Sequence, residues 1–277
     1  MTVSKLFEKG KNILSENKID NFANEARWIF EAVFAVSSQY LFFNANDEAN
    51  AEKSDEFIEK INRRVSGEPV QYIIGSWDFY GETFKVGEGV LIPRPETELL
   101  IDFAVDNLKG TENPIVIDLC SGSGCIGLTV ARLFPNAKVY MLEKSDKAFA
   151  YLSENKNKFG YNNAFLIHGD IFEGFEAFGL PEADLILSNP PYIESNEISQ
   201  LQSEVQKEPV MALDGGTDGL DFYRCIADKW LPYCKGAVAV ECGENQHLEI
   251  AKLFSSLNVS FIKDFNDVNR VVCGSIK

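Results

Sequence analysis

The sequence contains no apolar run of the about 20 residues that a membrane-spanning helix needs. Residues 1–20 carry charges throughout and show no apolar core of the signal-peptide type. We therefore expect no membrane partner and a cytoplasmic location. Soft metal ligands are also few, because the six cysteines include no C-x-x-C pair and only His168 and His247 accompany them. We predict reduced, mostly buried thiols and no metal site.

Positive charge is scarce as well, with 26 Lys and Arg against 42 Asp and Glu and a formal net charge of -16. Nucleic-acid binding usually depends on a basic face that neutralises phosphates, so this balance argues against a direct nucleic-acid partner. Within residues 1–70, a local basic patch would have to come from Lys5, Lys9, Lys11 and the pair Arg63-Arg64. We expect instead a solvated acidic surface that aids solubility.

Residues 1–70 show the apolar spacing of amphipathic helices. Apolar residues recur every three or four positions in residues 6–17, 24–36 and 54–65, with no strand-like segment between them. This pattern predicts a small helical N-terminal domain. In residues 71–92, aromatic and β-branched residues are interrupted by glycines, which predicts a β-hairpin linker.

Helical and strand-like segments alternate from residue 93 to residue 277. The strand-like segments are short and apolar on both faces, as expected when helices cover both sides of a mostly parallel sheet. The clearest are IVIDL, KVYMLE, AFLIHGD, ADLILSNPP and AVAVEC. We therefore predict a doubly wound, Rossmann-like α/β domain over residues 93–277.

A glycine-rich loop follows the first of these strands, in IVIDLCSGSGCIGL. Gly122 and Gly124 let the backbone approach a ligand, and Asp118 at the strand end can accept hydrogen bonds from it. Together with Gly127 they match part of the G-x-G-x-x-G pattern of dinucleotide folds. A NAD-dependent dehydrogenase is therefore an alternative at this point.

Two further acids end the next two strands. Glu143 lies about twenty residues after the loop, where a carboxylate can bind both hydroxyls of a ribose. Asp170 can accept the amino group of an adenine, while Ile171 packs against the edge of the ring. A single acid of this kind is more often a helix cap, but three in succession favour an adenosine-containing ligand.

The segment Asn189-Pro190-Pro191-Tyr192 follows the fourth strand and has no task in a dehydrogenase. Its prolines fix φ and lack N–H donors, which leaves a rigid chain with a carbonyl free to accept a hydrogen bond. Asn189 adds a second acceptor, and Tyr192 adds an aromatic face that can stack on a flat amide or base. These groups fit a planar amide or amino nitrogen.

Such a nitrogen is a poor nucleophile because its lone pair is delocalised. Accepting both of its protons in hydrogen bonds raises its electron density and turns it toward a methyl group placed in line at a sulfonium. No strong base is required, since the nitrogen becomes far more acidic after transfer and its proton can leave through Asn189 or water. The sequence therefore predicts an S-adenosylmethionine-dependent methyltransferase.

Several segments resemble, in order and spacing, the release-factor glutamine methyltransferases of the PrmC or HemK family, over nearly the whole chain. They are GEPVQYIIGSWDFYG, VLIPRPETELL, DLCSGSGCIGL, SNPPYI, EPVMALDGGTDGLDFYR and DFNDVNRVV. The resemblance implies a helical domain for substrate recognition, a hairpin linker and a seven-stranded methyltransferase domain. It also implies N5-methylation of the glutamine in the Gly-Gly-Gln tripeptide of class I peptide-chain release factors, and thus a role in translation termination.

The resemblance further implies roles for individual residues. Asn189, Pro190 and Tyr192 are expected to be catalytic and to hold the glutamine amide, with Pro191 and Arg94 in the substrate site. The cofactor is expected to contact Asp118, Cys120, Ser121, Gly122, Ser123, Gly124, Glu143, Asp170, Ile171 and Asn189. The run Arg94-Pro95-Glu96-Thr97-Glu98 is expected to lie beside the active site, where Arg94 or Glu98 orders the loops and does no chemistry. Glu98 can equally be the first-turn acid of the following helix.

Two positions depart from the family pattern. Cys120 stands where the family commonly has glycine, so we expect a loop conformation open to a side chain. Glu143 stands where aspartate is commoner, and its extra methylene asks the ribose or backbone to shift slightly. Both departures concern cofactor affinity more than activity.

Other functions fit parts of the pattern. A nucleic-acid adenine-N6 methyltransferase can use a similar N-P-P-Y segment, but the acidic charge argues against it. A ribosomal-protein glutamine methyltransferase is chemically identical and differs only in substrate. A module that senses adenosine ligands without turnover would leave the N-P-P-Y segment unused.

Overall fold

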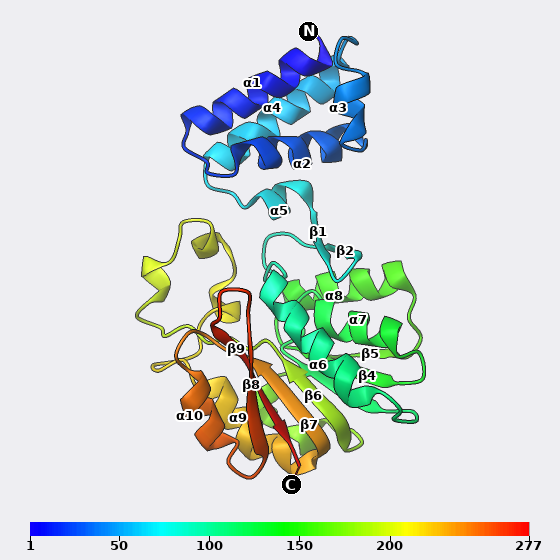
Figure 1. Cartoon of the computed structure of the whole chain (residues 1–277), viewed down its shortest axis with the longest axis vertical. Coiled ribbons are helices and arrows are strands. Elements are labelled where there is room, and N and C mark those ends of the chain that lie inside the picture. Colours follow the sequence, from blue (N-terminus) through cyan, green and yellow to red (C-terminus); the bar gives the residue numbers. More distant parts are fainter. Residues whose placement is uncertain (277) are drawn as a thin grey trace. The chain divides into compact units, whose positions relative to one another are not determined.

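The computed structural model describes residues 1–276, and the chain forms two compact units within them. The first unit comprises residues 1–77 and 202–207, and the second comprises residues 78–201 and 208–276. Figure 1 labels their helices and strands. In residues 1–276, no helix combines the length and the apolar character needed to cross a membrane.

The first unit is a helical bundle, as the apolar spacing predicts. Its helices are α1 (Val3–Glu16), α2 (Phe22–Phe34), α3 (Gln39–Phe43), α4 (Ala51–Val65) and α5 (Val70–Ile74) (Figure 1). The side chains of Thr2 and Asn50 cap α1 and α4 by accepting backbone N–H bonds in the first turn. The bundle buries the apolar stripes of its helices, including Leu6, Leu14, Ile29, Phe30, Phe57 and Ile61.

The pair Arg63-Arg64 does not form an open basic patch. Arg64 is 2% exposed, and its guanidinium pairs with Glu25 at 2.5 Å and with Glu204 of the segment 202–207. Arg63 donates from Nε to Glu68 at 2.8 Å. Removing one partner of a buried ion pair leaves an uncompensated charge, so Arg64 serves the fold of this unit and not phosphate binding.

A β-hairpin follows the bundle, formed by β1 (Ser76–Phe79) and β2 (Glu82–Lys85). Phe79 and Phe84 are buried in the core of the second unit. Residues 71–74 lie before the hairpin and are helical in α5, although their pattern predicts a strand. This short helix ends at Gly75, whose φ of 84° lies in the left-handed region that favours glycine.

The second unit contains the predicted seven-stranded sheet. The strand order is β5-β4-β3-β6-β7-β9-β8, with parallel pairs from β5 to β7 and antiparallel pairs on both sides of β9. The strands are β3 (Ile115–Leu119), β4 (Lys138–Glu143), β5 (Ala164–His168), β6 (Ala183–Ser188), β7 (Cys234–Glu241), β8 (Asn258–Lys263) and β9 (Asn269–Ser275).

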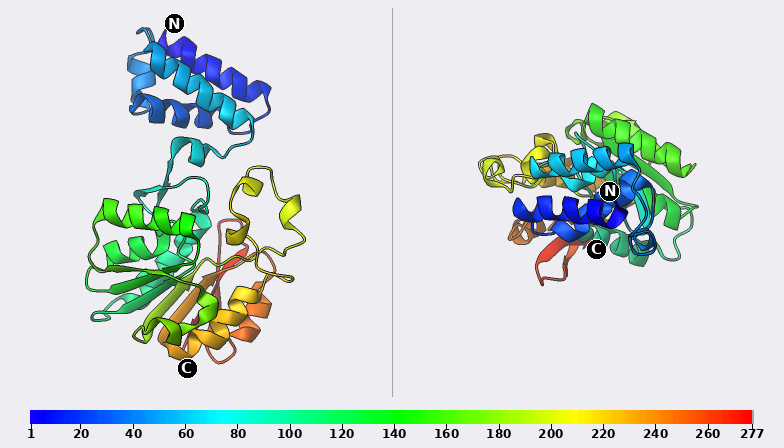
Figure 2. Two further views of the ribbon diagram at one scale, coloured as in Figure 1. Left: turned by 180° about the vertical axis from the view of Figure 1, so that it is seen from behind. Right: turned by 90° about the horizontal axis from the view of Figure 1, so that it is seen from above.

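Helices cover both faces of this sheet, which confirms the predicted α/β architecture (Figure 2). Adjacent residues of β3 show the alternation, because Val116 packs on one layer and Ile117 on the other. One layer contains α6 (Glu98–Leu108), α7 (Cys125–Leu133) and α8 (Asp146–Phe159), and the other contains α9 (Asp221–Lys229) and α10 (His247–Leu253). All six cysteines are free thiols and five of them are buried, as predicted.

Candidate active site

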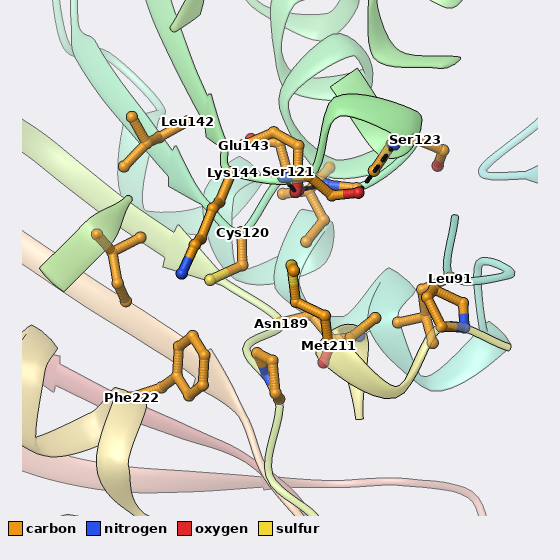
Figure 3. A pocket seen from close by; sticks show the side chains of 18 of the residues that line it. Leu91, Cys120, Ser121, Ser123, Leu142, Glu143, Lys144, Asn189, Met211 and Phe222 are labelled. Atoms are coloured by element: carbon orange, nitrogen blue, oxygen red, sulfur yellow. Dashed lines mark hydrogen bonds between the residues drawn. The ribbon is translucent and has the colours of Figure 1, made fainter. Parts of the chain in front are cut away.

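A pocket opens within the second unit at the carboxyl ends of β3, β4, β5 and β6 (Figure 3). It lies where the strand order reverses, since β4 is on one side of β3 and β6 is on the other. Ligands of open α/β sheets bind at such a switch point. The pocket has a volume of about 950 Å³, including its open mouth. Of the residues predicted for the site, its wall contains Cys120, Ser121, Gly122, Ser123, Glu143, Asp170, Ile171, Asn189 and Pro191.

Glu143, at the end of β4, ties the glycine loop to the next strand. Its Oε2 accepts the N–H of Gly122 at 2.8 Å, and its Oε1 accepts the N–H of Ser145 at 2.7 Å. Burial raises the pKa of this carboxyl above its ordinary value. Because each carboxylate oxygen can accept more than one hydrogen bond, Glu143 can also accept bonds from hydroxyl groups in the pocket.

Asp118 does not lie on the pocket wall. Its side chain is fully buried, and its Oδ2 accepts the N–H of Gly127 at 3.0 Å, in the first turn of α7. Burial, together with the nearby charge of Glu143, raises the pKa of Asp118 to about 7. Asp118 thus stabilises the glycine loop through the first turn of α7 and does not line the pocket. Gly124 is also absent from the wall and begins α7 as its N-cap.

Asp170 caps the short helix η2 (Ile171–Glu173) at the end of β5. Its Oδ1 accepts the N–H of Phe172 at 3.0 Å, and its Oδ2 pairs with Nζ of Lys144 at 2.7 Å. Burial acts to raise the pKa of Asp170, but the hydrogen bonds from Lys144 and Phe172 outweigh it and hold the pKa below its ordinary value. The carboxylate is therefore ionised on the pocket wall near neutral pH.

An aromatic wall beside Asp170 was not indicated by the sequence motifs. Phe222 of α9 lines the pocket and contacts the ring of Phe172 edge to face, with 5.0 Å between the ring centroids. Figure 3 shows Phe222 and Leu142 on the side of the pocket to which Lys144 extends. The wall thus combines an apolar surface with a row of polar groups, as small-molecule sites commonly do.

Cys120 has a φ of 60°, which differs from the expected conformation open to any side chain. In this left-handed region a residue with a Cβ is disfavoured by about 1 kcal/mol relative to glycine. This is a physical reason for the glycine that commonly occupies the position in the family that the sequence resembles.

We expect Gly124→Ala to lower the free energy of unfolding by about 3 kcal/mol, because φ is 83° and a Cβ would overlap the side chains of Leu152 and Leu128. Gly122→Ala is the matched control, since φ is 55° there and a Cβ would meet no atom within 4 Å. Its expected effect is about 1 kcal/mol. Urea unfolding of both variants tests the difference, and equal losses would contradict it.

Asn189 follows β6 and is held by two residues from other elements. Its Nδ2 donates to Oγ1 of Thr97 at 3.1 Å, and Oγ1 of Thr97 donates to Oε2 of Glu241 at 2.6 Å. Within residues 1–276, Oδ1 of Asn189 makes no hydrogen bond, and the residue lies on the pocket wall. Figure 3 shows Asn189 across the pocket from Glu143. Thr97 also lines the pocket, although the sequence motif assigned it no role.

The rest of the N-P-P-Y segment is only partly on the wall. Pro191 lines the pocket, whereas Pro190 and Tyr192 do not. The carbonyl of Tyr192 accepts from Nε2 of Gln246 at 2.8 Å, and burial raises the pKa of its phenol well above the ordinary value. Tyr192 packs against the core layer of α9 and α10, so the structure does not bring its ring to the pocket.

Arg94 does not line the pocket, but it pairs with the loop that begins at Glu208 and lines the pocket. Its guanidinium pairs with Glu208, which is 4% exposed and also accepts the N–H of Ile92 at 3.0 Å. The residues that follow, Pro209, Met211 and Ala212, line the pocket. Glu98 is the first residue of α6, and its Oε1 accepts the N–H of Tyr80 at 2.8 Å.

The sheet order and the pocket define a methyltransferase fold. Residues 96–216 match the family model described as "Methyltransferase small domain". The structure is similar to the solved hMettl16 catalytic domain in complex with MAT2A 3'UTR hairpin 1, with a TM-score of 0.60 and coverage of 90% of this chain and 91% of that chain. At 14% sequence identity, this likeness shows the fold alone.

Comparison of sequences identifies the family within this class. Residues 5–75 match the model described as "PrmC N-terminal domain". The chain is 37% identical over 264 residues to the release factor glutamine methyltransferase of Thermodesulfovibrio yellowstonii, covering 92% of this chain and 93% of the relative. It is 35% identical over 283 residues to that of Geobacter sulfurreducens, covering 99% and 97%. The chain therefore belongs to the release factor glutamine methyltransferase family, as the sequence motifs predict.

Proposed function

We propose that this chain transfers a methyl group from S-adenosylmethionine to the side-chain amide nitrogen of the glutamine in the Gly-Gly-Gln tripeptide of class I release factors. The observation that carries the proposal is Asn189, whose amide oxygen has no partner within residues 1–276 and lies on the pocket wall. The relatives named release factor glutamine methyltransferase match nearly the full length of this chain. The proposed organisation is a substrate-recognition domain over residues 1–70, a linker over 71–92 and a catalytic domain over 93–277.

The lining of the pocket supports S-adenosylmethionine as its ligand. No atom lies within 4 Å of a Cβ built at Gly122, so the loop is open on the side that a ligand would approach. Two buried or half-buried carboxylates, of Glu143 and Asp170, line the same wall as the apolar side chains of Leu142, Ile171 and Phe222. We assign residues 120–124 to the methionine part, Glu143 to the ribose, and Asp170 with Ile171 to the adenine.

The bound cofactor supplies a methyl group on a sulfonium, which is an electrophile without any metal or base. The chain's own residues prepare the nitrogen. Oδ1 of Asn189 accepts one N–H of the substrate amide. The carbonyl of Pro190, which accepts no hydrogen bond within residues 1–276, is proposed to accept the other, although Pro190 is not on the pocket wall. These two bonds orient the amide and raise its electron density, and the proton leaves to water after transfer. Stacking by Tyr192 stays a prediction.

The test uses full-length protein and S-adenosylmethionine labelled in its methyl group. The acceptors are an intact release factor, the same factor with the Gly-Gly-Gln glutamine changed to alanine, a ribosomal protein and DNA. We expect label in the intact factor alone. Label in the ribosomal protein or in DNA, with none in the factor, would assign the enzyme to one of the alternative substrates.

A further inference from the structure

Three side chains from separate elements meet at the pocket wall, where Asn189 and Thr97 line the pocket and Glu241 does not. Asn189 follows β6, Glu241 ends β7, and Thr97 ends the short helix η1 (Pro95–Thr97). In the parallel pairing of β6 with β7, Ser188 lies opposite Val240, so the next residues, Asn189 and Glu241, are brought to the same edge of the sheet. Thr97 and Glu241 are 1% and 2% exposed, so their hydrogen bonds are shielded from water.

The direction of these hydrogen bonds is determined by Glu241. An ionised carboxylate has no hydrogen, so the 2.6 Å bond requires the hydroxyl of Thr97 to donate its only hydrogen. The oxygen of Thr97 can then only accept from Asn189, and only the NH2 group of Asn189 can donate. The amide oxygen of Asn189 is thereby turned toward the pocket.

The opposite orientation would oppose the reaction. If the amide of Asn189 turned by half a revolution, its NH2 group would face the pocket. The substrate nitrogen also carries hydrogens, so two donors would then face each other and the substrate would lose an acceptor. An asparagine without the two residues behind it can adopt both orientations.

We propose that Thr97 and Glu241 are positioning residues that hold the amide of Asn189 with its oxygen toward the substrate nitrogen. The inference rests on the proposed function and deepens it, because it says how Asn189 is held for methyl transfer. The same pair would position Asn189 for any planar NH2 group. Neither residue touches the reacting atoms in this account. Both act through Asn189.

The orientation of the Asn189 amide depends on the charge of Glu241. Burial raises the pKa of Glu241 to about 7, the hydrogen bond from Thr97 opposes this rise, and Glu96 adds to it. Below that pH the neutral carboxyl can donate to Thr97, which frees the hydrogen of Thr97 to point at Asn189. The charged or titratable groups around Glu241 are Arg94, Glu96, Cys125, Tyr192, Tyr223, Cys242 and Arg270.

The first test compares Thr97→Val with Thr97→Ser in the full-length enzyme. Valine has nearly the shape of threonine but no hydroxyl, so we expect kcat on an intact release factor to fall about 10- to 100-fold. The Kd for S-adenosylmethionine, measured by calorimetry, should stay within about threefold, because Glu143 and the glycine loop are unchanged. Serine keeps the hydroxyl and should restore kcat to within about threefold of the unaltered enzyme. Equal kcat values for the valine and serine variants would overturn the inference.

The second test is the pH profile of Glu241→Gln, which also covers the case in which Thr97→Val does not fold. Glutamine is neutral at every pH and permits both directions of the hydrogen bond. We expect kcat of the unaltered enzyme to rise as the pH increases through about 7, while the variant stays flat near the lower level. A variant profile that rises in parallel with that of the unaltered enzyme would contradict the proposed role of Glu241.

A third measurement does not depend on the substrate. The side-chain amide of Asn189 in ¹⁵N-labelled full-length protein is assigned by its loss in Asn189→Asp. The hydrogen that donates to Thr97 should be distinct from the other and protected from exchange at about pH 8, and it should be exposed in Thr97→Val. An unaltered enzyme that does not methylate release factor would refute the proposed function alone. Two equally unprotected amide hydrogens in the unaltered enzyme would refute the positioning role.

Discussion

Replacing Asn189 with alanine is expected to reduce kcat by about 1,000-fold, which is the upper end of the loss found when one preorganised hydrogen-bonding group is removed from a reacting centre. The reason is that Oδ1 of Asn189 accepts a hydrogen bond that strengthens as the amide nitrogen gains positive charge. Glu143 lies across the pocket from Asn189 (Figure 3), and neither it nor the cofactor loop, residues 120–124, is altered by this substitution. The Kd for S-adenosylmethionine should therefore change by less than about threefold.

Single-turnover methylation and calorimetry on the same preparation separate these two effects. Asn196→Ala is the matched control, because Asn196 is exposed and lies in the same segment after β6, away from the pocket wall. It should leave kcat within about twofold. If Asn189→Ala loses cofactor binding and turnover to the same degree, the residue shapes the pocket and does not hold the substrate.

Periodic apolar patterns made the fold predictable from the sequence. Buried strands such as β3 and β6 are apolar on both faces, and the amphipathic helices α1, α2 and α4 repeat at helical spacing, so their type could be read locally. The short helices α3 and α5 have only five residues each, too few for a period to appear. Residues 202–207 belong to the first unit, where Glu204 pairs with Arg64, a contact between distant positions that no local pattern reveals.

The candidate site shows the same limit. Sequence motifs indicated the glycine loop, Glu143, Asp170 and Asn189 because each stands at a strand end, and the structure brings them to one pocket. The run that contains Thr97 was expected beside the site, but the contact of Thr97 with Glu241 was missed. The two residues are separated by 144 positions and meet only through the packing of η1 against the sheet. The sequence did contain two hints: Thr97 belongs to the motif VLIPRPETELL, and Glu241 is an acid at the end of a buried strand.

Residues predicted for the site because they stand at strand ends line the pocket more often than residues predicted because they are neighbours of a motif. Tyr192 is adjacent to the prolines, but it packs against the core layer of α9 and α10 and is not on the pocket wall. Arg94 was predicted either to lie in the substrate site or to order the loops. Its pairing with the buried carboxylate of Glu208 favours loop ordering. Side-chain direction after a strand end depends on tertiary packing, which a motif does not encode.

Replacing Glu143 with glutamine is expected to weaken binding of S-adenosylmethionine by about 100-fold. The carboxylate accepts N–H bonds from Gly122 and Ser145 with its two oxygens, so the NH2 group of a glutamine would face one of these donors. In the complex, the ribose hydroxyls would lose a charge-assisted acceptor and would face the NH2 group or the repositioned loop, which amounts to about 3 kcal/mol and corresponds to about 100-fold in Kd.

Calorimetry with S-adenosylmethionine measures this loss, and Glu143→Asp distinguishes its causes. Aspartate keeps both acceptor oxygens, and the family commonly has it here, so binding should stay within about tenfold of the unaltered enzyme. Glu154→Gln removes the same charge from an exposed position on α8, away from the pocket, and should have no effect. Unchanged binding in Glu143→Gln would mean that the ribose is held elsewhere. A similar loss in Glu143→Gln and Glu154→Gln, with binding kept in Glu143→Asp, would point to the overall negative charge of the unit, because only the two glutamine substitutions each remove one charge.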